Sequence, residues 1–388
     1  MFGMIVGMPV SAQQGPALGL PRSLACNPGP VDSACAAELA SLELLSDPFK
    51  GKIDPTIEVG NFLITARVMT ALALARSGSW NNATAAIEHL PTLPQLGAWA
   101  DLASLARSGN RPDIVRQASH ALAAFASSPD AQRLRLAEVP YAYAVNAQIK
   151  LAAGERDAAN ASLNLAIAGV MNVANSDSVY AVSRTLIALH EVRGAEAALN
   201  ALKTLRPEDG RLANAVNLAF ALLQRGRMGE ARAVGVVVQE WLSAETQKRA
   251  RGGAISAEMW QANTLNGCLG ALAGDLEPAR NANDNYPPMT MANPGPNYRL
   301  GVYGVSTVQY GGVDSLRTVS TGCLALAHHK SGNAAQGQAV IRDLRTSDDR
   351  MRSDMYVLFN QERELTAVAG RVYRWAYLSH VWAAASVR

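Results

Sequence analysis

The sequence ALALARSG at residues 71–78 returns, slightly changed, as LASLARSG at residues 102–109. Each copy is an alanine-rich apolar segment that ends in a glycine, and glycine ends helices readily because it adopts the left-handed conformation without a side-chain clash. Similar ends occur at Gly154, Gly194, Gly226, Gly274 and Gly332. Successive glycines are 31 to 58 residues apart, a spacing that predicts one two-helix unit for each glycine.

Small residues recur at fixed distances from these glycines. Seven positions before the glycine stand Ala71, Ala147, Ala219, Gly267 and Ala325, and five positions after it stand Ala83, Ala159, Ala231, Ala279 and Gly337. Two antiparallel helices approach closely only where their side chains are small, so these positions predict where paired helices cross. The units at Gly109 and Gly194 depart, with Leu102 and Ile114 in the first and Ile187 and Leu199 in the second. The alternative interpretation is chance, because alanine is abundant throughout.

From about Asn61 to Arg345 this pattern resembles the tetratricopeptide repeat, in a degenerate form. That family places small residues on facing helices at these offsets and a glycine at the turn. The resemblance implies an all-α fold, a right-handed α-solenoid of stacked antiparallel helix pairs. We expect the repeats over residues 59–274 and a further helical repeat with a capping helix over residues 316–388.

The expected capping helix runs from about Gln361 to Ser386. Its apolar residues recur three and four positions apart and form one stripe, which predicts packing on the preceding repeat. The stripe contains Leu365, Val368, Val372, Trp375, Ser379 and Trp382, with Tyr373 and Tyr377 to the side. A docking face for a partner is the alternative.

An irregular insertion loop is expected over residues 275–315, because prolines, asparagines and glycines accumulate there. A short hairpin near residues 302–308 is one interpretation of its apolar alternation. Tyr and Arg are enriched in binding sites, so the candidate partner-binding residues are Tyr286, Tyr298, Arg299, Tyr303 and Tyr310. The alternative is a structural loop whose tyrosines pack on the repeats.

Composition excludes several classes of protein. The chain has 388 residues, of which 49% are hydrophobic and 17% charged, with a net charge of +3. A mostly disordered chain needs fewer apolar residues and more net charge. The charge balance gives no reason to expect a nucleic-acid partner. Apolar runs are interrupted before they reach the roughly 18 residues of a membrane span.

The first residues indicate export. Residues 1–12, MFGMIVGMPVSA, are typical of the apolar core and cleavage site of a secretory signal, although a basic start is missing. A short buried segment is the alternative. Residues 13–58 form an N-terminal segment that contains Cys26 and Cys35. A periplasmic or secreted location follows from the export hypothesis, and a cytoplasmic one from the alternative.

The four cysteines form two candidate disulfide pairs. Cys26 and Cys35 enclose a Pro- and Gly-rich turn, and Cys268 and Cys323 are the second pair. An even number of cysteines in an exported protein suggests disulfides. In a cytosolic protein, Cys268 and Cys323 would be small buried residues.

No catalytic motif accompanies the repeats, so we expect neither a cofactor nor a metal. The adjacent His328 and His329 would point about 100° apart on a helix and would not share a metal comfortably. The hypothesis is therefore a non-catalytic scaffold of the bacterial cell envelope that binds a protein or peptide on a concave surface, for example within an envelope complex. The alternative is an envelope polysaccharide- or peptidoglycan-active enzyme on an α-superhelical or toroidal scaffold, with Tyr298, Arg299 and His329 as contributors.

Overall fold

The computed structural model describes residues 29–30, 32–45, 58–88, 90–171, 179–206, 210–249, 257–284, 312–355 and 361–386. In several helical stretches, including 58–62, 312–317, 345–355 and 361–369, the backbone alone is described. Throughout these parts of the protein the regular structure is helical, as the sequence predicts, and it contains no strand. The leader at residues 1–12 and the hairpin near 302–308 lie outside the described residues.

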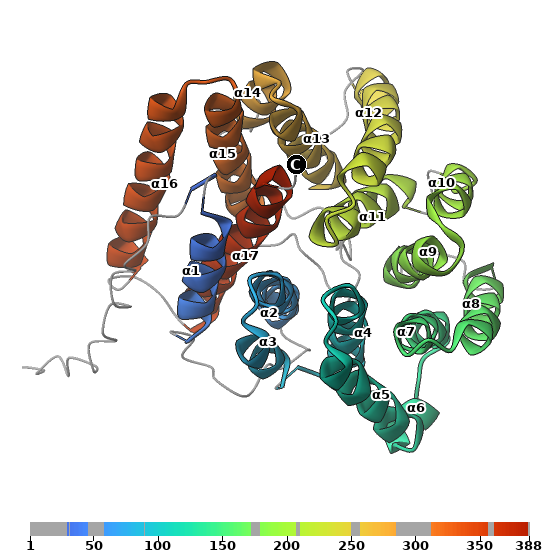
Figure 1. Cartoon of the computed structure of the whole chain (residues 1–388). Coiled ribbons are helices and arrows are strands. Elements are labelled where there is room, and N and C mark those ends of the chain that lie inside the picture. The colour runs from blue at the N-terminus through green and yellow to red at the C-terminus, as the bar shows by residue number, and fades with distance from the viewer. Residues whose placement is uncertain are drawn as a thin grey trace, which may run out of the picture.

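Helices that follow one another along the sequence pack as pairs, in two layers (Figure 1). The inner layer consists of α2 (Glu58–Arg76), α4 (Thr92–Ser108), α7 (Glu138–Ala152), α9 (Val179–Arg193), α11 (Arg211–Gln224), α13 (Ala257–Ala273), α15 (Gly312–Lys330) and α17 (Gln361–Ser386). Their outer partners are α3 (Trp80–Ile87), α5 (Pro112–Ala126), α8 (Arg156–Met171), α10 (Ala195–Lys203), α12 (Met228–Arg249), α14 (Leu276–Asp284) and α16 (Ala334–Met355). The short α6 (Pro129–Gln132) precedes α7, and α1 (Ser33–Leu45) packs on α17 and α2.

The turns inside the pairs explain why the glycines recur. At Gly78, Gly154, Gly226, Gly274 and Gly332 the backbone is left-handed, with φ between 72° and 89°. In each case the next residue donates its backbone N–H to the carbonyl five positions before it, over 2.8 to 2.9 Å. This hydrogen bond is that of the Schellman motif, which satisfies a carbonyl left open at the helix end. The repeated glycine therefore marks a repeated turn.

The turn between α4 and α5 uses asparagine in place of glycine. Gly109 has φ −87°, whereas Asn110 has φ 53°, and Arg111 donates to the carbonyl of Ala106 over 2.8 Å. Asparagine tolerates the left-handed region better than most residues. The turn thus lies one residue later than predicted. With this correction, the position seven residues before the turn is the buried Ala103 and not Leu102.

The small residues lie where the sequence predicts that helices cross. The eight alanines at the two offsets are all fully buried. A Cβ added to Gly267 on α13 would lie 2.5 Å from the Cβ of Ala282 on α14. A Cβ added to Gly337 on α16 would lie 2.8 Å from the carbonyl oxygen of Ala325 on α15. Both distances are too short, so a larger residue would force these pairs apart.

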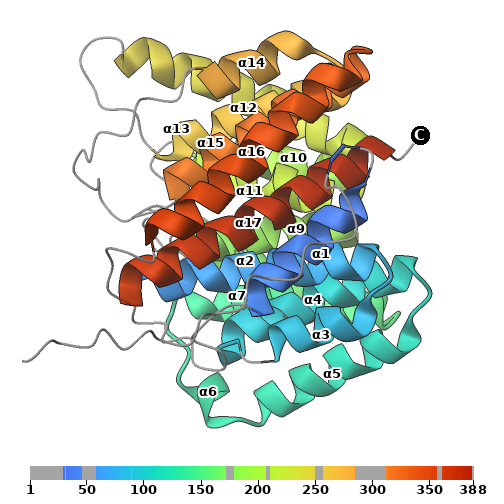
Figure 2. The ribbon, with the colours of Figure 1, turned by 90° about the vertical axis from the view of Figure 1, so that its left-hand side faces the viewer.

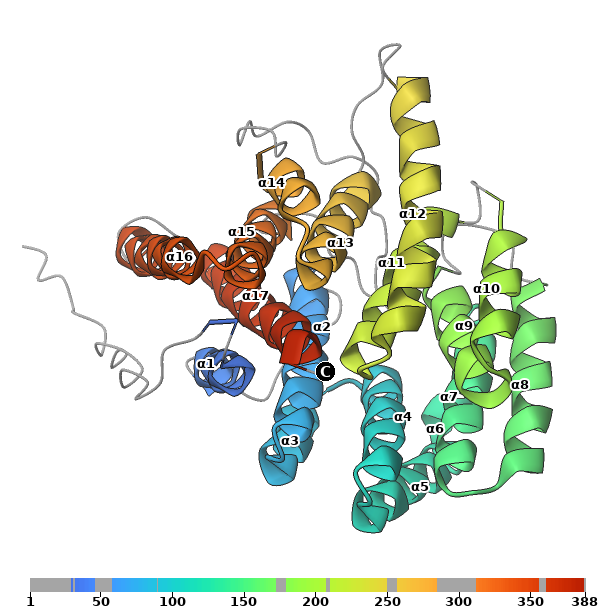
Figure 3. The ribbon, with the colours of Figure 1, turned by 45° about the horizontal axis from the view of Figure 1, so that its top comes forward.

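The inner layer returns to its starting point. Each inner helix packs on the next, and α17 packs on both α15 and α2. Figures 1 and 3 show α17 between these two helices, with α1 on its outer side. In Figure 2, α1, α17 and α16 cross the same face of the molecule. The described helices therefore form a closed circuit, a feature that the predicted solenoid of stacked helix pairs does not specify.

The middle of helix α17 lies in the interior, in contrast to the predicted cap. All twelve residues from 371 to 382 are buried, so this part of the helix is covered on every side and not along a single stripe. Trp375 and Trp382 are fully buried, and the ring of Tyr377 stacks on Phe220 of α11 with centroids 4.1 Å apart. A helix that is buried around its circumference is typical of a core element.

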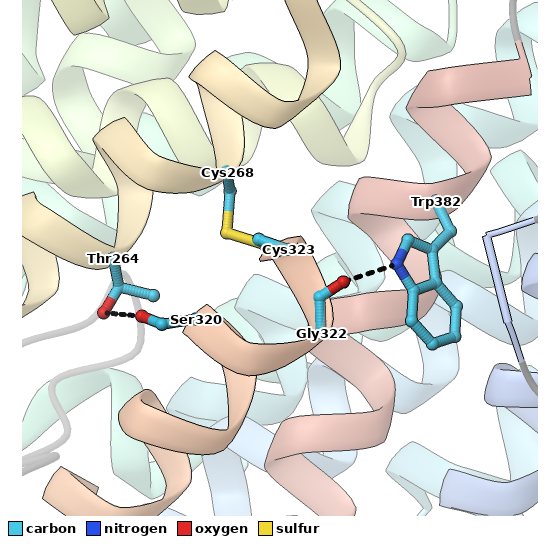
Figure 4. The surroundings of a disulfide bond; sticks show 6 residues. All are labelled: Thr264, Cys268, Ser320, Gly322, Cys323 and Trp382. Carbon is cyan, nitrogen blue, oxygen red and sulfur yellow. Dashed lines mark hydrogen bonds between the residues drawn. A yellow bond between two sulfur atoms is a disulfide. The ribbon is translucent and has the colours of Figure 1, made fainter. Parts of the chain in front are cut away.

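A disulfide joins two neighbouring inner helices, which confirms the prediction for Cys268 and Cys323 (Figure 4). One turn earlier on each helix, the Ser320 hydroxyl donates to the Thr264 hydroxyl over 3.2 Å. The indole of Trp382 on α17 donates to the carbonyl of Gly322 over 3.4 Å. The disulfide and these two hydrogen bonds hold α13, α15 and α17 together.

The other predictions on segments are met only in part. Of the expected insertion at residues 275–315, residues 276–284 form α14 and α15 begins at Gly312, while residues 285–311 lie outside the described residues. Leu276 and Ala279 of α14 pack into the core, which stabilises a helix despite Pro278 in its first turn. Cys35 is buried and disulfide-bonded, and Cys26 lies outside the described residues.

Candidate functional site: a central polar cluster

A group of charged side chains lies where inner helices meet. We call it the central polar cluster, and it comprises Arg76 of α2, Asp101 of α4, Arg184 and Glu191 of α9, Arg225 at the end of α11, and His380 of α17. These residues come from five helices that are distant in sequence. The closed circuit of the inner layer brings them together.

Asp101 is shared by two arginines. Its Oδ1 accepts from Arg184 Nη1 over 2.7 Å and its Oδ2 accepts from Arg184 Nη2 over 3.2 Å, while Arg225 Nη2 also donates to Oδ1. The Asp101 carboxylate is 3% exposed and the Arg184 side chain is wholly buried. A buried charge is tolerated only when it is paired and hydrogen-bonded, and both conditions hold here.

Arg184 makes further contacts through both of its terminal nitrogens. It also donates to Gln148 Oε1 over 3.0 Å and to the carbonyl of Gly97 over 2.6 Å, and its guanidinium lies over the ring of Tyr141. A side chain at position 97 would collide with the Tyr141 hydroxyl and with Arg184. Glycine at this position therefore lets the guanidinium reach the backbone of α4. Burial raises the pKa of Tyr141, so its hydroxyl stays protonated.

Arg225 links the cluster to the end of α9. Its Nε donates to Glu191 Oε1 over 2.6 Å, and the same oxygen accepts from the Ser104 hydroxyl over 3.1 Å. Burial opposes the charge on Arg225, but the carboxylates of Glu191 and Asp101 outweigh that effect and its pKa is raised. Arg225 is therefore a permanent cation.

His380 is a neutral imidazole with a defined tautomer. Its Nε2 lies 2.9 Å from the carbonyl oxygen of Met69, which can only accept, so Nε2 carries the proton. Its Nδ1 accepts from Arg76 Nη1 over 3.4 Å. Burial, and then the positive charges of Arg76 and Arg225, lower the pKa of His380 to about 3. Burial also lowers the pKa of Arg76, which donates to the carbonyl of Leu223 over 3.3 Å.

This arrangement favours structure over proton transfer. General acid–base catalysis needs a group that gains and loses a proton near the working pH. In the cluster, Asp101 and Glu191 each accept hydrogen bonds from arginines, and both nitrogens of His380 are engaged. The cluster ties α2, α4, α9, α11 and α17 into one unit.

One histidine outside the cluster contacts a carboxylate. His190 Nε2 on α9 is hydrogen-bonded to Glu230 Oε2 in the first turn of α12. The His190 side chain is 10% exposed, and its Nδ1 makes no hydrogen bond within the described part of the protein. A histidine oriented by a carboxylate is one component of many catalytic sites.

The residues predicted from sequence fall elsewhere. Tyr286, Tyr298, Arg299, Tyr303 and Tyr310 all lie outside the described residues. Half-buried His328 and His329 occupy the last turn of α15. Within the described ranges no group of His, Cys, Asp or Glu side chains could hold a metal ion.

Sequence reasoning misses the central polar cluster. Its signal is weak but present: Asp101 and Arg184 are isolated charges inside apolar helical segments, AWADLASLA at residues 98–106 and VYAVSRTLIAL at residues 179–189. Such charges are rarely buried unless they are paired. That rule would predict an oppositely charged partner for Asp101 and for Arg184, but it would not identify the partner residue.

Comparison with known proteins gives no family assignment: no family model matches the sequence, and neither a curated protein nor a solved structure matches it. None of the described helices is both long enough and apolar enough to cross a membrane.

Proposed function

We propose that the protein is a non-catalytic scaffold of the bacterial cell envelope that binds a protein or peptide partner. The observation that carries this proposal is the architecture: stacked helix pairs with repeated turns, whose two central carboxylates are both paired with arginines. Such pairs expose long helical surfaces, and binding a partner there needs no reactive group. We also propose that the pairs are degenerate tetratricopeptide-like units stacked with a right-handed sense.

The closed circuit limits where a partner can dock. Because α17 packs on α15, α2 and α11, the inner faces of these helices are covered by the protein itself. We therefore place the docking surface away from them, at the ends of the helix pairs and on the segment that carries Tyr286, Tyr298, Arg299, Tyr303 and Tyr310. The disulfide between Cys268 and Cys323 supports export to an oxidising compartment.

Affinity capture from envelope extracts tests the scaffold. The immobilised protein is compared with a variant in which a Gly/Ser linker replaces residues 285–311. We expect wild type to retain a partner that rebinds in purified form, and the variant to lose it. Recovery of no rebinding partner by wild type would contradict the scaffold, and equal recovery by both proteins would remove the segment from the docking surface.

N-terminal sequencing of the mature protein tests export, which retention of Met1 would contradict.

Two observations favour a second candidate function, an enzyme that acts on envelope polysaccharide or peptidoglycan. They are the closed circuit of inner helices and the contact between His190 and Glu230. In this hypothesis Glu230 orients the imidazole of His190 for the reaction. Release of soluble fragments from purified peptidoglycan by wild type, lost in His190→Gln, would establish this activity. Absence of release by the folded wild type would exclude it for that substrate.

A further inference from the structure

Arg76 differs from the other arginines of the central polar cluster. Arg184 and Arg225 are each paired with a carboxylate, whereas Arg76 has no carboxylate within ion-pair distance among the described residues. Its hydrogen bonds use Nη1 alone, to Leu223 and His380. Its Nε and Nη2 form no hydrogen bond to another described residue, and the side chain belongs to a half-buried residue at the end of α2. Nη1 of the guanidinium is therefore anchored, while Nε and Nη2 are two donors without a partner among the described residues.

The charges of the cluster do not balance. Three arginines contribute +3 and the two carboxylates −2, which leaves +1, while His380 is neutral. The last turns of α2 and α11 add partial negative charge at their carbonyl ends, roughly half an elementary charge each. That partial charge supports Arg76 but also disfavours a doubly charged anion. The site thus suits a single negative charge.

The geometry points to a carboxylate as the ligand. The Nε and Nη2 protons of an arginine form a planar pair of donors that matches the two oxygens of a carboxylate. Because the other edge is fixed by Leu223 and His380, little side-chain freedom remains to be lost on binding. We propose that Arg76 binds a carboxylate presented by the partner, either from an acidic residue or from the C-terminus of a polypeptide. This inference rests on the proposed scaffold function.

The protein contains a matched control. Arg107 occupies the same position in the second ARSG sequence, but it is exposed and belongs to a different turn. Arg76→Lys keeps the positive charge but removes the planar pair of donors. Arg76→Gln removes the charge and the planar pair of donors. Thermal melting of each variant establishes that it folds.

The first experiment needs no partner. The side-chain Nε–H resonances of arginine are titrated with acetate at constant ionic strength, with inorganic phosphate in a parallel titration. We expect one resonance, lost in Arg76→Lys, to shift saturably with acetate in the millimolar range and more weakly with phosphate. Arg107→Gln should retain that shift. The proposal is overturned if acetate shifts no resonance saturably, or if the shifting resonance survives in folded Arg76→Lys.

The second experiment links the site to the partner. Capture is compared between Arg76→Gln and Arg107→Gln, and synthetic peptides from the captured partner are tested with free and amidated C-termini. We expect Arg76→Gln to bind the partner several-fold more weakly than wild type, and Arg107→Gln to bind it as wild type does. If amidation of the C-terminal peptide weakens its binding, the bound carboxylate is the C-terminus of the partner. If both variants bind the partner equally well although wild type binds acetate at Arg76, the partner does not use this site and the proposal is refuted. Failure of wild type to capture any partner would refute the scaffold but leave the acetate result standing.

Discussion

His380 makes the stability of the protein depend on pH in a defined direction. In the folded protein burial and two nearby arginines hold its pKa at about 3, whereas its ordinary value is 6.5. Below pH 6.5 the unfolded protein therefore binds a proton that the folded protein excludes. Stability contributed by neutral His380 is complete above pH 6.5 and is lost as the pH falls towards 3.

The magnitude follows from these two pKa values. The loss relative to pH 8 is about 2 kcal/mol at pH 5 and about 3 kcal/mol at pH 4. It approaches about 5 kcal/mol below pH 3, which is a large part of the stability of an ordinary domain. Carboxylates titrate over part of the same range, so a variant is needed to isolate the histidine.

The variant is His380→Gln, because a glutamine amide can donate to the Met69 carbonyl and accept from Arg76 but does not titrate. Urea unfolding is followed by tryptophan fluorescence at pH 7, 5 and 4. Between pH 7 and 5, wild type should lose about 2 kcal/mol more than the variant. His120→Gln, at an exposed histidine, is the control and should show the same dependence of stability on pH as wild type. Parallel pH profiles for wild type and His380→Gln would refute the reasoning.

Three further substitutions test the packing. Cys268→Ser should lower the free energy of unfolding by about 4 kcal/mol in urea, since the disulfide closes a loop of 55 residues; an unchanged midpoint would contradict this. Gly267→Ala should destabilise by roughly 1–3 kcal/mol in thermal melting, because a Cβ there meets α14, whereas Gly229→Ala on α12, with open space around it, should not. Asp101→Asn should cost about 3–5 kcal/mol by chemical denaturation, because the buried Arg184 loses its ion pair with Asp101 and Arg225 loses one of its two carboxylates. The same change at exposed Asp113 is its control, and equal losses would show that burial of the pair is unimportant.

The sequence predicts local features of this fold better than distant ones. The small crossing residues lie seven positions before and five positions after the turn glycine, so one unit contains the whole signal. Even there, Asn110 shifts a turn by one residue because asparagine replaces the expected glycine. The disulfide is predictable because only four cysteines are available.

Ring closure and the central polar cluster are not predictable in this way. The contact of His380 with Met69 spans 311 residues, and that of Arg225 with Asp101 spans 124. Such contacts depend on the summed curvature of every helix pair between them, and no single motif encodes that sum. The same limit explains why the sequence predicts a one-sided cap for α17 although its neighbours bury every residue from 371 to 382.

The packing of α17 against both α15 and α2 has an evolutionary consequence. An open repeat protein can gain or lose a unit by duplication and still fold, because only the contacts at the point of change are affected. Here an added pair would move the last helix away from the first, and a lost pair would force them to collide. The number of units is therefore fixed by geometry, and we expect variation within this lineage to enter through loops and side chains while the length of the array stays constant.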